Sequence, residues 1–229
     1  MKYCSVCGEQ VRVGVPQGDN RPRHICDHCG TIHYQNPKVV AGCIAHWEDR
    51  VLMCRRAIEP RHGKWTVPAG FMENGETTYQ AAMRETIEEA NARVAIDDLY
   101  VTVNLPHINQ VYMLFRGRLL DLDFFPGEES LAVELMSESQ IPWEAMAFPT
   151  VTEALKLYFA DRARGQFGVH MLDIVREGGQ PGAQPRGAPF QRSHPVAPVD
   201  QAHDAEEGGG EESDGAAIGR FHRGHQPLR

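Results

Sequence analysis

Three glutamates at helical spacing are the residues of this sequence best suited to chemistry. Glu85, Glu88 and Glu89 lie in the segment 79–89, which has no glycine or proline and is rich in helix-favouring residues. They occupy positions i, i+3 and i+4 on one helix face, where like charges repel by roughly 0.2–0.5 kcal/mol per pair. Clustered carboxylate oxygens are the ligands that Mg²⁺ and Mn²⁺ prefer. The face therefore predicts a divalent-cation site, with a solvated acidic surface as the alternative.

The residues that flank this segment predict where the helix begins and ends. Thr77 is a suitable N-cap, and Gln80 is placed to complete a capping box with it. Asn91 tolerates the left-handed backbone conformation that commonly ends a helix. We therefore expect the carboxylates to be carried by one capped helix.

Four of the six cysteines form two Cys-x-x-Cys pairs. Cys4 and Cys7 are separated from Cys26 and Cys29 by eighteen residues. In a reducing compartment this spacing predicts a tetrahedral Zn²⁺ site, and four thiolates leave no position open for water. The zinc is therefore expected to be structural, since a ribbon of about 30 residues is too small to build a core. A pair of redox motifs is the alternative, but neither pair begins a helix in a βαβ pattern.

The other cysteines and the histidines near the second pair are assigned no role. Cys43 and Cys54 lie in apolar, strand-like runs and are expected to be buried, inert thiols. His24 and His28 flank the second pair and are expected on the surface.

Composition limits the classes of function. The chain has 229 residues and a net charge of −8, so it has no general attraction to nucleic acid or anionic membranes. No apolar run approaches the roughly 20 residues of a membrane span, and the N-terminal residues do not resemble a secretion signal. We expect a cytoplasmic protein.

Hydrophobic periodicity predicts the elements that hold the helix in place. A mixed α/β arrangement is expected, with a sheet between two helices. The expected strands are 39–45, 51–55, 99–105, 111–119 and 131–136, and the expected second helix is 150–164. Beyond residue 175 the chain is dominated by Gly, Pro, Ala and charge, and is expected to be disordered. The predicted organisation is a zinc ribbon at 1–35, a main domain at 36–174 and a tail at 175–229.

The acidic helix and the residues before it resemble the Nudix box, G-x5-E-x7-REUxEExGU. Gly70, Glu76 and Arg84 occupy the matching positions, as do the three glutamates. Thr86 stands where an aliphatic residue is usual, and Asn91 replaces the last glycine. Neither departure removes a carboxylate. The resemblance favours the metal site over the solvated surface and implies the Nudix α/β/α sandwich with a mixed sheet.

The resemblance extends to about residue 174, where the chain is similar to zinc-ribbon Nudix proteins related to the plant plastid FAD pyrophosphatase. It implies Mg²⁺-dependent (or Mn²⁺-dependent) hydrolysis of a nucleotide diphosphate, with FAD giving AMP and FMN. NADH or ADP-ribose pyrophosphatase is the alternative. NADH pyrophosphatases carry SQPWPFPxS shortly after the box, whereas SQIPW lies here at 139–143.

The resemblance also implies roles for the matched residues. Glu85, Glu88 and Glu89 would hold the cation, with the Gly70 carbonyl as a further ligand. Arg84 and Glu76 would form an ion pair that orients the helix. The base that deprotonates water is left open between Glu88, Glu89 and Glu129. The alternative for Glu129 is a surface charge of its loop.

Other residues are expected to contact substrate. Arg55 and Arg56 end a strand that faces the box, and because their side chains alternate at most one should meet a phosphate. Tyr112 and the segment 107–110 could form a wall for a base or flavin ring, unless that segment is only a hairpin turn.

Two non-enzymatic classes remain as alternatives. A nucleic-acid-binding zinc-ribbon protein is disfavoured because the chain lacks a basic stripe with interleaved aromatics. A ligand-sensing Nudix regulator usually has a damaged box, and this box keeps every carboxylate. The expected partner is a nucleotide, without nucleic acid or membrane, and the sequence leaves a homodimer open.

Overall fold

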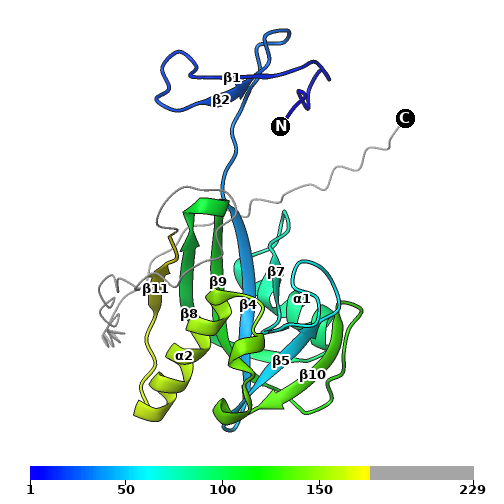
Figure 1. Ribbon diagram of the computed structural model, residues 1–229, viewed down its shortest axis with the longest axis vertical. Coiled ribbons are helices and arrows are strands. Elements are labelled where there is room, and N and C mark those ends of the chain that lie inside the picture. Colours follow the sequence, from blue (N-terminus) through cyan, green and yellow to red (C-terminus); the bar gives the residue numbers. More distant parts are fainter. Residues whose placement is uncertain (176–229) are drawn as a thin grey trace, which may run out of the picture. The chain divides into compact units, whose positions relative to one another are not determined.

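The computed structural model describes residues 1–175 (Figure 1). The tail predicted to be disordered lies outside the described residues from 176 onward. Residues 1–175 form an N-terminal ribbon and a main domain.

The N-terminal ribbon is a small antiparallel sheet whose order is β1-β2-β3. Each Cys-x-x-Cys pair is followed by a glycine with positive φ, Gly8 at 80° and Gly30 at 72°. The Gly8 N–H donates to the Cys4 carbonyl, and the Gly30 N–H donates to the Cys26 carbonyl, at 2.9 Å each. These tight turns bring both cysteines of a pair to one side. The strands are β1 (Arg12–Gly14), β2 (Arg23–Ile25) and β3 (Ile32–His33).

The main domain is built on an eight-stranded mixed sheet with the order β10-β5-β4-β9-β8-β11. Two short strands lie off this path, since β6 pairs with β5 and β7 pairs with β4. β4 is parallel to β9 and β8 is parallel to β11, whereas the other pairs are antiparallel. The strands are β4 (Lys38–Trp47), β5 (Arg50–Arg56), β6 (Trp65–Thr66), β7 (Ala69–Phe71), β8 (Val94–Leu105), β9 (Gln110–Leu119), β10 (Ser130–Met136) and β11 (His170–Asp173).

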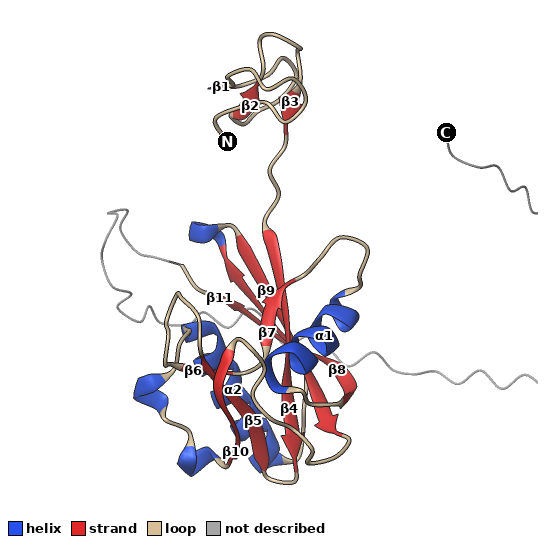
Figure 2. Cartoon of the chain, turned by 90° about the vertical axis from the view of Figure 1, so that its right-hand side faces the viewer, coloured by secondary structure: helices blue, strands red, loops and turns tan. Residues whose placement is uncertain are grey.

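Two helices cover the two faces of this sheet (Figure 2). Helix α1 (Thr78–Ala90) packs Ala81 and Ala82 against Ala41 of β4 and Phe115 of β9. Helix α2 (Pro149–Arg164) packs on the opposite face, where its apolar side joins a core that includes Ile44. The expected α/β/α sandwich with a mixed sheet is therefore observed. Three short 3-10 helices are η1 (Pro106–Ile108), η2 (Glu138–Gln140) and η3 (Trp143–Ala145).

Two strands differ from the periodicity-based prediction. β8 begins at Val94 rather than at residue 99, and its pairing with β9 shifts register between Ile96 and Asp98 and again between Leu99 and Val101. These irregularities break the alternation on which the prediction depended. β11 was not predicted, because only one of its four residues, Leu172, is buried.

A buried polar cluster links β8, α2 and β11. The Tyr100 hydroxyl donates to Asp161 Oδ2 at 2.9 Å, and His170 Nε2 lies 2.6 Å from the same oxygen. Arg164 forms an ion pair with the other oxygen of Asp161. Tyr100 is fully buried and Asp161 is 2% exposed, so this cluster satisfies polar groups that lie inside the core.

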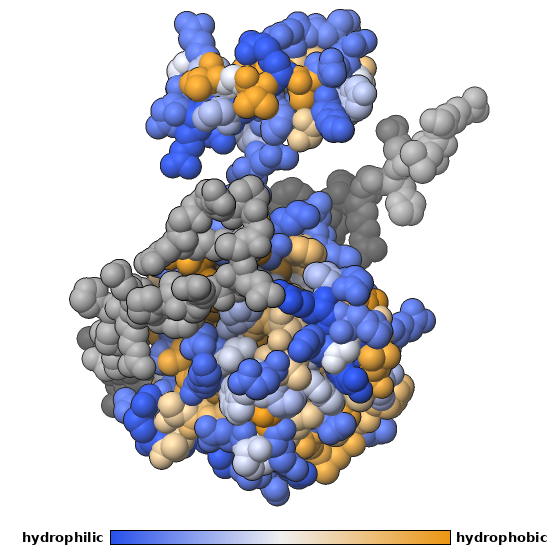
Figure 3. Space-filling model, viewed as in Figure 1, coloured by the Kyte–Doolittle hydropathy of each residue, from blue (hydrophilic) through white to orange (hydrophobic). Residues whose placement is uncertain are grey.

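The surface of the main domain is mixed in polarity. The visible face of the main domain carries mostly hydrophilic side chains with apolar patches between them (Figure 3). No helix among residues 1–175 has the length and apolar character that crossing a bilayer requires.

Candidate active site

Helix α1 is capped at both ends by the residues predicted for this purpose. The Gln80 N–H donates to Thr77 Oγ1 at 3.2 Å, and the Thr77 N–H donates to Gln80 Oε1 at 2.8 Å. At the other end, Asn91 adopts a left-handed conformation with φ 48°, and its N–H donates to the Ile87 carbonyl. The helix that carries the three glutamates is therefore set by local sequence at both ends.

The three glutamates of α1 differ in exposure. Glu85 and Glu89 are 8% and 5% exposed, whereas Glu88 lies in solvent. A Cβ atom added at Gly70 would lie 2.3 Å from the carboxylate oxygens of Glu85. Only glycine therefore lets β7 approach this carboxylate so closely.

Arg84 joins the carboxylates to the preceding loop. It donates two hydrogen bonds to Glu76, at 3.1 and 2.8 Å, so the ion pair expected between these residues is present. Its Nη1 also donates to Glu85 at 2.7 Å and to Glu88 at 2.9 Å, and Nη2 donates to the Phe71 carbonyl. One guanidinium thus orients three carboxylates and one backbone oxygen.

Thr86, which stands where the Nudix pattern has an aliphatic residue, leaves no buried polar group without a hydrogen bond. Thr86 is fully buried, and its hydroxyl donates to the Ala82 carbonyl at 2.7 Å. The hydrogen bond satisfies the hydroxyl inside the core, so a polar residue can replace an aliphatic one here.

Burial raises the pKa of both inward-facing carboxyls. The pKa of Glu89 is raised to about 8, first by desolvation and then by the charge of Glu85, and is opposed by the charge of Arg56. Desolvation likewise raises the pKa of Glu85. Two buried carboxylates that repel each other are a suitable donor set for a divalent cation.

The cysteine cluster of the ribbon has the geometry of a tetrahedral metal site. Within residues 1–175 it is the only group of three or more Cys, His, Asp or Glu donor atoms that all lie within 4.8 Å of one another. The sulfur atoms of Cys4 and Cys29 are 3.7 Å apart, and those of Cys7 and Cys26 are 3.5 Å apart. A tetrahedron with Zn–S bonds of 2.3 Å requires about 3.8 Å between sulfurs. The four thiols therefore fit Zn²⁺.

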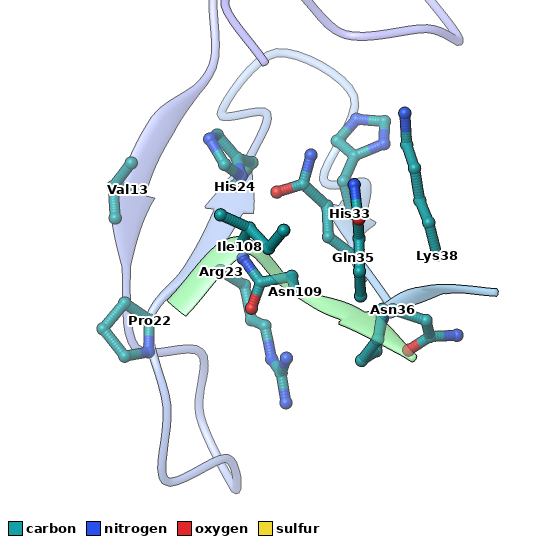
Figure 4. A pocket seen from close by; sticks show the side chains of 12 residues that line it. Val13, Pro22, Arg23, His24, His33, Gln35, Asn36, Lys38, Ile108 and Asn109 are labelled. Atoms are coloured by element: carbon teal, nitrogen blue, oxygen red, sulfur yellow. The ribbon is translucent and has the colours of Figure 1, made fainter. Parts of the chain in front are cut away.

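One histidine next to this cluster was missed by sequence reasoning. His33 Nε2 lies 3.3 Å from Cys4 Sγ, a contact that can orient the thiolate. His33 is paired with His24 across β2 and β3 (Figure 4), whereas His28 is exposed. His24 and His28 are not among the clustered donors.

Family models match both parts of this chain. Residues 2–35 match the family described as Nudix N-terminal, and residues 36–158 match the NUDIX domain. The chain belongs to the Nudix family. It combines an N-terminal segment of the zinc-ribbon type with a NUDIX domain, as the cysteine spacing and the box indicated.

A solved structure and a curated relative resemble this Nudix chain. A Nudix hydrolase from Nitrosomonas europaea is 58% identical, covers 76% of this chain and 100% of its own, and has a TM-score of 0.72. An NAD-capped RNA hydrolase NudC from Salmonella typhi is 34% identical over 96 residues, which are 41% of this chain and 34% of that protein. The chain thus spans about a third of the length of the curated relatives it matches.

A more distant structure shows the same fold. An ADP-ribose pyrophosphatase from Streptococcus suis is 20% identical, with a TM-score of 0.50, and covers 59% of this chain and 99% of its own.

The structure separates the two arginines that were candidates for substrate contact. Arg55 is exposed, and its Nε donates to the Gly63 carbonyl. The guanidinium of Arg56 lies 5.2 Å from the centre of the Phe148 ring. Its positive charge partly offsets the desolvation that raises the pKa values of Glu89 and Tyr112. Of the two arginines, Arg56 is therefore the one whose charge acts on a carboxylate of α1.

The three remaining candidates occupy different positions. Tyr112 is half-buried on β9, and desolvation raises its pKa. Glu129 is exposed, but its charge raises the pKa values of both Glu85 and Glu89, which places it near the Nudix carboxylates. The segment 107–110 forms the tight connection between β8 and β9, with Asn109 at φ 52° and its carbonyl bonded to the Lys38 N–H. Figure 4 shows Asn109 next to Ile108 in this connection.

Proposed function

We propose that this Nudix enzyme hydrolyses the diphosphate linkage of a dinucleotide with Mg²⁺ or Mn²⁺, and that FAD, cleaved to AMP and FMN, is its preferred substrate. The observation that carries the hydrolysis is the pair of buried carboxylates, Glu85 and Glu89, held beside Gly70 by a capped helix. The flavin assignment is supported by the resemblance to FAD pyrophosphatases along the chain to residue 174.

The metal ligands in this proposal are Glu85, Glu88 and Glu89, with the Gly70 carbonyl as a further donor. These carboxylates are not gathered as tightly as the cysteines. Such spacing suits Mg²⁺, which keeps several waters and usually takes one or two carboxylates together with substrate phosphates. When bound, the cation neutralises diphosphate oxygens and makes water more acidic.

Arg84 and Glu76 act as orienting residues in this proposal. Their two hydrogen bonds fix the loop before α1 to the helix itself. Because Arg84 also contacts Glu85 and Glu88, it holds two of the proposed ligands in defined rotamers.

Glu129 is the general base that the geometry favours over Glu88 and Glu89. Within residues 1–175 its carboxylate has no hydrogen-bond or ion-pair partner, whereas Glu88 is bound by Arg84. Glu89 is buried and faces Glu85. An exposed, unpaired carboxylate close to the metal ligands is free to accept a proton from water.

Arg56, Phe148 and Tyr112 form the proposed substrate wall. Arg56 stacks over Phe148, and its charge acts on Tyr112. A guanidinium of this kind can bind a phosphate while the aromatic side chains contact a base or a flavin ring.

A second substrate class is favoured by the comparisons. The matched curated relatives are named NAD-capped RNA hydrolases, and a structural neighbour is named an ADP-ribose pyrophosphatase. NADH, ADP-ribose and the NAD-bearing 5′ end of an RNA are therefore competing substrates, and the sequence-based exclusion of nucleic acid has no support from these relatives.

Substrate choice is tested by measuring kcat/KM for FAD, NADH, ADP-ribose and a short NAD-capped RNA, with Mg²⁺ or Mn²⁺ and product analysis. We expect the highest value for FAD, with AMP and FMN as products. A tenfold higher kcat/KM for another substrate, about 1.4 kcal/mol of transition-state preference, would refute the flavin assignment and leave diphosphate hydrolysis in place.

Replacement of Arg56 tests the substrate wall. Arg56→Gln is expected to lower kcat/KM by roughly 10- to 100-fold, since a hydrogen bond to a charged group is lost. Arg55→Gln is the matched control, because Arg55 is exposed whereas Arg56 is half-buried beside Phe148, and we expect a change of less than about twofold. Equal effects of the two substitutions would remove Arg56 from the site.

A further inference from the structure

The loop 120–129, which follows β9, is attached to the C-terminal end of α1. The Phe125 N–H donates to the Ala90 carbonyl at 3.0 Å, and the Gly127 N–H donates to the Glu89 carbonyl at 3.0 Å. These carbonyls belong to the last turn of the helix, where no later helical N–H can reach them. The loop therefore completes the hydrogen bonding of the helix that carries the proposed metal ligands.

Gly127 is the point of closest approach. A Cβ atom added there would lie 1.8 Å from the Glu88 carbonyl oxygen and 2.9 Å from the carbonyl carbon. The φ of Gly127 is not in the left-handed region. Glycine is therefore needed because the loop backbone approaches α1 closely, and not because of an unusual backbone conformation.

The far end of the loop is held by the sheet. The Ala57 N–H donates to the Glu129 carbonyl at 2.7 Å, and the Ser130 N–H donates to the Gly127 carbonyl at 3.1 Å. The backbone of Glu129 is thus fixed between α1 on one side and the end of β5 on the other.

Asn91 adds a contact that the glycine of the Nudix pattern cannot make. Both residues tolerate the left-handed conformation that ends α1, and Asn91 has φ 48°. The side-chain amide of Asn91 also donates to the Phe125 carbonyl at 3.2 Å. The departure from the pattern therefore supplies a direct bond between the helix end and the loop.

We propose that Asn91 and Gly127 are positioning residues that fasten the loop 120–129 to α1 and thereby hold Glu129 beside the metal-binding carboxylates. The inference rests on the proposed function, in which Glu129 acts on water. It assigns to Asn91 a role that the cap alone does not require.

A double-mutant cycle between Asn91→Gly and Glu129→Gln tests this coupling. Asn91→Gly keeps the helix cap and removes only the side-chain amide. It is expected to lower kcat on the best substrate about five- to tenfold in the native background and less than twofold in the Glu129→Gln background. Equal losses in both backgrounds would show that Asn91 acts on general stability and would overturn the proposal.

Gly127→Ala is the second probe, with Gly168→Ala as its control. A Cβ atom at Gly168 meets nothing within 4 Å, and its φ is ordinary, so this variant should match the unaltered protein. Gly127→Ala is expected to lower kcat at least tenfold, with Mn²⁺ affinity measured by electron paramagnetic resonance changed less than threefold. Activity like that of Gly168→Ala would contradict the proposal, and if Gly127→Ala fails to fold, the Asn91 cycle decides.

Hydrogen exchange separates this inference from the proposed function. The amides of Phe125 and Gly127 should be protected in the unaltered protein and exchange faster in Asn91→Gly but not in Gly168→Ala. If the protection of these amides were unchanged in Asn91→Gly, Asn91 would not fasten the loop to α1, regardless of the activity of the variant. An unaltered protein that hydrolyses none of the dinucleotides would refute the proposed function, while these amides still report on the loop.

Discussion

Replacing Glu89 with Gln is expected to reduce kcat by more than about 100-fold without unfolding the protein. The substitution keeps the shape of the side chain and removes a proposed metal ligand, and a catalytic cation contributes several kcal/mol of transition-state stabilisation. Steady-state kinetics at saturating Mg²⁺ measure the effect. Glu73→Gln is the matched control, since Glu73 is an exposed glutamate of the preceding turn, and we expect it to change kcat less than twofold.

The same substitution should change how stability depends on pH. The pKa of Glu89 is raised by burial from 4.5 to about 8, so its ionisation opposes folding. The protonated Glu89 side chain therefore contributes fully to the free energy of unfolding below pH 4.5. This contribution is lost as the pH rises through about 8, by up to about 1.4 kcal/mol per pH unit. Urea unfolding without added Mg²⁺ should show this loss in the unaltered protein and a smaller one in Glu89→Gln. A variant with near-native activity would mean that this carboxylate binds no cation, and a variant less stable than the unaltered protein at pH 8 would contradict the raised pKa.

The second large effect is expected at the ribbon. Cys26 is fully buried within the cysteine cluster, and Cys26→Ser should reduce zinc from about one per chain to well below one and abolish the folded ribbon. Structural zinc sites of this type contribute on the order of 10 kcal/mol to folding. Elemental analysis and circular dichroism of the pure protein provide the measurements.

His28→Ala is the control for this prediction. His28 is exposed and is not one of the clustered donors, so zinc content and unfolding should be unchanged. Loss of zinc on His28→Ala, or a zinc-free ribbon that unfolds like the unaltered one, would show that the four cysteines are not the complete site.

The parts of the site that depend on neighbouring residues could be predicted from sequence. The cap pair Thr77 and Gln80, the left-handed Asn91 and the alignment of three glutamates on α1 all follow from local rules, and each is observed. The cysteine spacing also predicted the clustered thiols, because each Cys-x-x-Cys pair is a local turn followed by a glycine.

Features that depend on tertiary contacts were harder to predict. Alternation predicts that at most one of Arg55 and Arg56 faces the site, and only the fold gives a reason to prefer Arg56, whose charge acts on Glu89. His33 carries no spacing signal, since it contacts Cys4 from twenty-nine positions away. Gly127 looks like an ordinary loop glycine until its distance from α1 is known.

Strand limits failed where the hydrophobic pattern was weak. The first register shift of β8 falls at Asp97 and Asp98 and the second at Tyr100, so polar and apolar residues do not alternate regularly there. β11 buries a single side chain, and no periodicity can be recognised from one residue.

The cluster formed by Tyr100, Asp161 and His170 indicates where the folded main domain ends. The match to the NUDIX domain model ends at residue 158, before two members of the cluster and before β11. A chain cut at that point would retain every box residue, yet the Tyr100 hydroxyl would lose its acceptor in the core and β8 would become an open edge of the sheet. The shortest piece that can fold cooperatively is therefore expected to extend through Asp173, about fifteen residues beyond the end of the domain-model match.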